Sequence, residues 1–76
     1  MMKKKRESSI SYNKLWKLLI DRGMKKKELQ KASGISASSI AKLGRNSNVT
    51  TDILLKVCHA LDCDISDIME VNHKID

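Results

Sequence analysis

Three consecutive lysines, Lys25, Lys26 and Lys27, stand where the sequence predicts the start of a helix. Their charges oppose the positive end of the helix dipole, by roughly 0.3 to 1 kcal/mol for each exposed cation. The same position favours an anion, because free backbone N–H groups and ammonium groups can share it. We therefore expect this cluster to hold a phosphate group of a nucleic acid.

A second candidate surface lies on the short helix expected from Ala37 to Leu43, which Ser36 can cap. Its outward side chains are small or cationic, namely those of Ala37, Ser38, Ala41 and Lys42. Such a face can approach base edges in the major groove, where a lysine donates to guanine and a methyl group contacts thymine. We expect base contacts from these four residues, with Lys42 foremost.

Metal binding and catalysis have little support. Cys58, His59, Cys63 and His73 do not match a standard zinc site, and both cysteines fall on predicted apolar positions. The serines lack an accompanying nucleophile motif. We expect reduced thiols, no metal, no cofactor, no small-molecule substrate and no enzymatic activity.

The charge is unevenly distributed along the 76 residues, which leave room for one domain. Residues 1–31 hold eleven Lys and Arg against three acidic residues, a balance of +8, whereas residues 32–76 hold four against six, a balance of −2. A basic pole suits a polyanion, although a merely solubilising surface would look the same. Aromatic residues make up only 3% of the chain, which favours duplex DNA over single-stranded nucleic acid.

The pattern of apolar residues and caps predicts an all-α domain over residues 10–76, after a basic, mobile arm over residues 1–9. Tyr12 and Trp16 are assigned to the core or its edge, with no role in ligand binding. Lys17, Asp21 and Arg22 interrupt or close the first apolar stretch, so we expect no signal peptide, no membrane span and a cytoplasmic location. The expected helices are Tyr12–Asp21, Lys25–Ala32, Ala37–Leu43, Thr51–Leu61 and Ile65–Met69.

The stretch from Leu18 to Val71 resembles the Cro/C1-type, or Xre-type, helix-turn-helix family. The residues that carry the resemblance are Gly23-Met24, Glu28-Leu29, Gly34-Ile35-Ser36, Ile40-Ala41-Lys42-Leu43 and Ile53 to Leu61. The resemblance implies a five-helix bundle of the lambda-repressor type, in which helices 2 and 3 form the helix-turn-helix. It also implies base contacts from Ala37, Ser38 and Lys42, and phosphate contacts from Lys26, Ser36, Arg45 and Asn46.

Three positions depart from the family pattern. Gln30 replaces an alanine at the contact between helices 2 and 3, Lys25 replaces a capping Ser or Thr, and Gly44 replaces an acidic residue. The last two alter the surroundings of the expected phosphate contacts more than they alter the fold.

The sequence therefore predicts a transcriptional regulator, a repressor, that binds double-stranded DNA as a homodimer. A surplus of apolar residues near the carboxyl end could form the dimer seam or close the core: Ile65, Ile68, Met69, Val71 and Ile75. The alternative function is a protein-interaction module, such as an antitoxin-like partner, whose acidic carboxyl-terminal half binds another protein.

Overall fold

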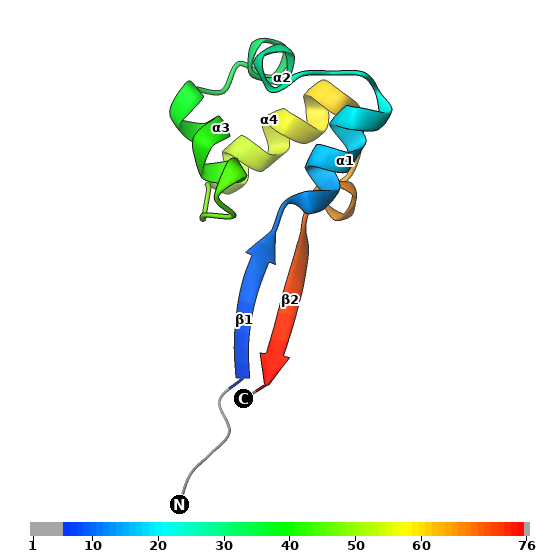
Figure 1. Ribbon diagram of the computed structural model, residues 1–76. Helices are drawn as coiled ribbons and strands as arrows, with labels where there is room; N and C mark the ends of the chain where they lie inside the picture. The colour runs from blue at the N-terminus through cyan, green and yellow to red at the C-terminus, as the bar shows by residue number, and fades with distance from the viewer. Residues whose placement is uncertain (1–5, 76) are drawn as a thin grey trace, which may run out of the picture.

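A computed structural model describes residues 6–75 of the chain. Its helical part consists of four α-helices (Figure 1), with the bounds α1 (Asn13–Asp21), α2 (Lys26–Ser33), α3 (Ala37–Gly44) and α4 (Thr51–Leu61). The four helices agree with the predicted ones to within one residue at each end. Within the described residues, no helix is long and apolar enough to cross a membrane.

The core lies where the apolar faces of the four helices meet. Burying such side chains supplies most of the stabilisation that a domain of this size can obtain. Its largest fully buried side chains are those of Tyr12, Leu15, Leu29, Leu43, Val57, Leu61 and Ile68.

The fifth predicted helix is wrong as an α-helix. Ile65–Asp67 form a single 3₁₀ turn, η1, in which the Asp67 carboxylate accepts a hydrogen bond from the backbone N–H of Asp64 at 3.0 Å. Ile68 follows with its side chain fully buried, and the backbone is extended from Glu70 onward. The turn ends early because the chain must anchor Ile68 and then leave the helical part as a strand.

A two-stranded antiparallel sheet corrects the all-α prediction. β1 (Arg6–Ser11) pairs with β2 (Glu70–Ile75), with Arg6 opposite Ile75 and Ser11 opposite Glu70. The ribbon extends away from the helices, and both described ends of the chain lie at its far end (Figure 1). Residues 6–9 thus belong to a strand and not to the expected arm, whereas residues 1–5 of that arm lie outside the described residues.

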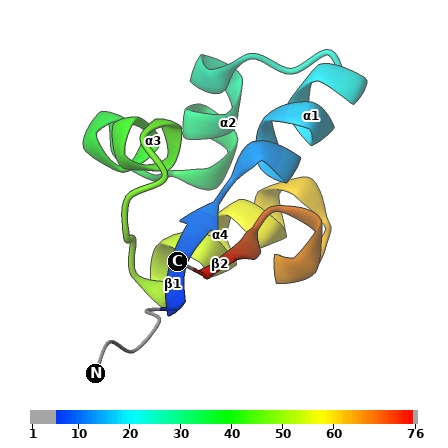
Figure 2. The same ribbon diagram turned by 60° about the horizontal axis from the view of Figure 1, so that its bottom comes forward.

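When the end of the molecule that carries the ribbon is turned toward the viewer, α2 and α3 lie next to each other, and α4 runs beneath them (Figure 2). α2 packs against both α3 and α4. The fold thereby holds two short helices, joined by a turn, on a longer supporting helix.

Candidate nucleic-acid interface

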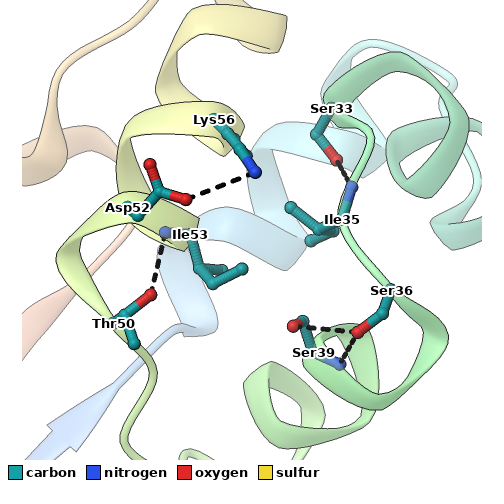
Figure 3. Close-up of polar contacts among 8 residues, drawn as sticks. All are labelled: Ser33, Ile35, Ser36, Ser39, Thr50, Asp52, Ile53 and Lys56. Atoms are coloured by element: carbon teal, nitrogen blue, oxygen red, sulfur yellow. Dashed lines mark hydrogen bonds and ion pairs between the residues drawn. The ribbon is translucent and has the colours of Figure 1, made fainter.

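The turn between α2 and α3 has the geometry that its sequence predicts. Gly34 ends α2 in the left-handed conformation, with φ of 75°, and its N–H donates to the Gln30 carbonyl at 2.9 Å. Ile35 is buried directly after it, and the Ser36 hydroxyl accepts a hydrogen bond from the Ser39 N–H at 3.1 Å (Figure 3). A glycine, an apolar anchor and a cap therefore fix the direction in which α3 leaves the turn.

Leu29 on α2 and Leu43 on α3 are fully buried, and they hold the two helices to the core. The opposite face of α3 is open: Ala37, Ser38, Ala41 and Lys42 are all exposed. Within residues 6–75, the Ser38 hydroxyl and the Lys42 ammonium have no hydrogen-bond or ion-pair partner. The structure thus brings the four predicted base-contacting residues together on one accessible surface.

The start of α2 is exposed and rich in cations, as predicted. Glu28 accepts a hydrogen bond from the Lys25 N–H at 2.9 Å, which confirms the expected half of a capping box. The Lys25 side chain has no acceptor atom to complete the box. The N–H groups of Lys26 and Lys27 lack an acceptor among the described residues and remain available to an anion.

The other three predicted phosphate-contacting residues differ in whether their side chains already make hydrogen bonds within the protein. Arg45 is exposed, whereas the Ser36 hydroxyl already caps α3. Asn46 adopts a φ of 56°, and its side-chain oxygen accepts a hydrogen bond from the Tyr12 N–H at 2.9 Å. This bond ties the α3–α4 loop to the start of α1, so the Asn46 side chain has a structural task that the sequence analysis missed.

Trp16 lies at the edge of the core and makes a contact that the sequence analysis did not predict. Tyr12 is buried, and burial raises the pKa of its phenol, but Trp16 is only half-buried. The Lys26 ammonium lies 4.6 Å from the centre of the Trp16 ring, a cation–π contact between α1 and the start of α2. No local pattern predicts it, because the two residues lie on different helices on either side of a turn.

The two thiols lie at the far end of α4. Burial raises the pKa of Cys58 and raises that of Cys63 to about 11, so both are protonated at neutral pH. Over residues 6–75, no group of three or more His, Cys, Asp or Glu is arranged to hold a metal ion.

Comparison with known proteins agrees with this geometry. Residues 14–74 match the sequence profile of the Cro/C1-type helix-turn-helix DNA-binding domain. The crystal structure of the transcriptional regulator VanUg, form II, superposes with a TM-score of 0.83 at 55% sequence identity, over 88% of this chain and 89% of that chain. A search of the curated proteins finds no match.

Proposed function

The chain belongs to the Cro/C1-type helix-turn-helix family, and we propose from this premise that it is a repressor whose α3 enters the major groove of duplex DNA. The family consists of DNA-binding transcriptional regulators, not enzymes. The observation that carries the proposal is the exposed face of α3, whose side chains are small or cationic, beside the cationic start of α2. The first surface can contact bases while the second holds the phosphate backbone.

Base contacts are assigned to the exposed face of α3. Lys42 donates to guanine O6 and N7, Ser38 donates or accepts, and the methyl groups of Ala37 and Ala41 contact thymine. Selection from randomised duplexes, with the wild type and with Lys42→Ala, tests this assignment. We expect the variant to lose preference at one base pair per half-site, whereas a uniform loss over all sequences would place Lys42 on phosphate.

Phosphate contacts are assigned to Lys25, Lys26, Lys27, Ser36, Arg45 and Asn46. Replacing the three lysines with Gln should flatten the salt dependence of duplex binding, by about 0.9 in log–log slope for each phosphate that the protein no longer neutralises. The matched control removes the same charge elsewhere, by replacing Lys14, Lys17 and Lys56 with Gln. An equal change of slope in both triple variants, or no change in either, contradicts the assignment.

We assign the active form to a homodimer on a palindromic operator. One such domain makes few phosphate contacts, and a second copy doubles them. Val71 on β2 is 52% exposed, which leaves apolar surface near the base of the ribbon for a partner copy. A monomer mass that does not change with concentration, together with selected sites that lack two-fold symmetry, contradicts this assignment.

A protein-interaction role, antitoxin-like in kind, is the second candidate. Leu55 and Ile65 are exposed beside Asp62 and Asp64, on the side of α4 and η1 that lines a shallow hollow. This face is apolar and acidic, unlike the start of α2. Duplex binding that is weak and indifferent to salt would favour this second function over the first.

A further inference from the structure

The Lys26 ammonium lies in a corner formed by three helices. The ammonium is 4.6 Å from the centre of the Trp16 ring on α1. A Cβ atom added at Gly44, the last residue of α3, would lie 3.9 Å from the same ammonium. No carboxylate pairs with Lys26 within the part of the chain that the structure describes. Its charge is therefore positioned but not neutralised.

The two neighbouring lysines are not held in this way. All three lysines are exposed, but among the described residues only Lys26 lies over an aromatic ring. A free lysine side chain loses rotamer entropy when it becomes fixed on a ligand, whereas a restrained one has already lost part of it. The negative end of the α3 dipole also favours a cation beside Gly44.

We propose that Trp16 is a positioning residue, whose ring holds the Lys26 ammonium ready for a DNA phosphate that docks at the start of α2. Lys26 is then the main phosphate contact among the three lysines. The proposal rests on the proposed function and adds to it a role for a half-buried aromatic residue that does not itself touch DNA. Gly44 contributes by placing no carboxylate beside the Lys26 ammonium.

A double-mutant cycle on duplex binding tests the coupling. Lys26→Gln should lower the salt slope by about 1 per bound subunit and weaken binding more than Lys27→Gln does. Trp16→Leu should weaken binding by about 2- to 10-fold, the cost of immobilising one long side chain. It should have no further effect in the Lys26→Gln background and its full effect in the Lys27→Gln background.

Trp16→Phe keeps an aromatic face and should restore affinity to within about 2-fold of the wild type. A structural defect at position 16 would instead lower affinity equally in both lysine backgrounds. Additive effects of Trp16→Leu and Lys26→Gln overturn the proposal, as does equal loss from Lys26→Gln and Lys27→Gln. Thermal melts confirm that each variant is folded.

Gly44 offers a second test that leaves Trp16 intact. Its φ is not positive and an added Cβ meets only the Lys26 ammonium, in ordinary contact, so larger residues fit there. Gly44→Glu should neutralise Lys26 and reduce affinity as Lys26→Gln does, whereas Gly44→Gln, of similar size, should change it much less. Equal losses for the two substitutions would contradict the proposal.

The fluorescence of the single tryptophan separates this proposal from the proposed function. In the free protein, Lys26→Gln should alter the Trp16 emission and Lys27→Gln should not. If the wild type shows no salt-dependent duplex binding, the proposed function fails, and Trp16 then has no phosphate contact to position. If it binds DNA but the cycle shows no coupling, the positioning role alone fails.

Discussion

The first turns of α2 and α4 both have free backbone N–H groups at the positive end of the helix dipole, but the side chains around them are of opposite kinds. At α4, the Thr50 hydroxyl accepts a hydrogen bond from the Ile53 N–H at 3.2 Å, and Asp52 supplies a negative charge in the first turn (Figure 3). Both features stabilise a helix at its positive end. At α2, the capping position is Lys25, and two further lysines follow.

The start of α4 favours stability of the fold, whereas the start of α2 favours the binding of an anion. Among the described residues, the first two N–H groups of both helices lack an acceptor, those of Lys26 and Lys27 at α2 and those of Thr51 and Asp52 at α4. The two starts differ instead in their side chains: α4 has a hydroxyl cap, whereas α2 has no side-chain cap bond and carries three cations that repel one another. α2 therefore depends on packing, above all on the fully buried Leu29. Its instability is offset when an anion binds, which is the condition under which the proposed regulator acts.

The largest expected effect is at the cap of α4. Thr50→Ala removes the acceptor for the Ile53 N–H and should lower the free energy of unfolding by about 1 kcal/mol. Thr50→Ser keeps the acceptor and serves as the control. Urea unfolding measures the difference, and the salt slope of DNA binding should be unchanged in both variants.

If Thr50→Ala leaves stability unchanged, the cap is not a stabilising feature. If it alters the salt slope instead, the start of α4 is part of the DNA-binding surface. Either result removes the contrast between the two helix starts.

At the start of α2, a substitution at the capping position should raise the free energy of unfolding instead of lowering it. Lys25 has the extended backbone of a capping residue, with φ of −93° and ψ of 160°, so Lys25→Ser supplies the missing acceptor without a change of conformation. We expect a gain of roughly 0.5 to 1 kcal/mol in stability, because the serine completes the capping box with Glu28. DNA affinity should fall, because one cation is removed from the phosphate site.

Lys27→Ser is the matched control for that gain. It removes the same charge from the same helix start but supplies no cap, so it should lower DNA affinity with a smaller change in stability. If Lys25→Ser raises stability and leaves DNA affinity unchanged, Lys25 does not contact phosphate.

Local features explain how much of the fold is predictable from the sequence. Each α-helix is set by a capping residue or glycine at its ends and by apolar spacing within it, and both are visible in a short window. The β1–β2 ribbon is not predictable in this way, because its strands are separated by almost the whole chain. Each strand alone is a short, polar segment whose partner no local pattern identifies.

The residues of the candidate site are likewise predictable only where a local pattern places them. The open face of α3 and the lysines of α2 follow from helix periodicity, and the structure places them where the sequence predicts. The Asn46 bond to Tyr12 and the Lys26 contact with Trp16 join different elements, 34 and about ten residues apart in sequence, so periodicity does not reveal them.

The smallest expected effect is at Asp52, which is exposed and forms a 3.2 Å ion pair with Lys56. Asp52→Asn should lower the free energy of unfolding by about 0.3 to 1 kcal/mol at low salt, and less at high salt, because exposed charges are screened. Lys56→Gln breaks the same pair but keeps the acid in the first turn. The difference between the two variants therefore isolates the interaction of Asp52 with the helix dipole from the ion pair.

DNA affinity is the sharper measurement on these two variants. If α4 is purely a support, removing the Asp52 charge changes duplex binding by no more than the small, salt-screened effect of a distant charge. A several-fold gain in affinity from Asp52→Asn, without one from a charge change of the same sign on α1, such as Asp21→Asn, would mean that an anion approaches α4 as well. Both helix starts would then contact phosphate, and they would differ only in how strongly each one binds it.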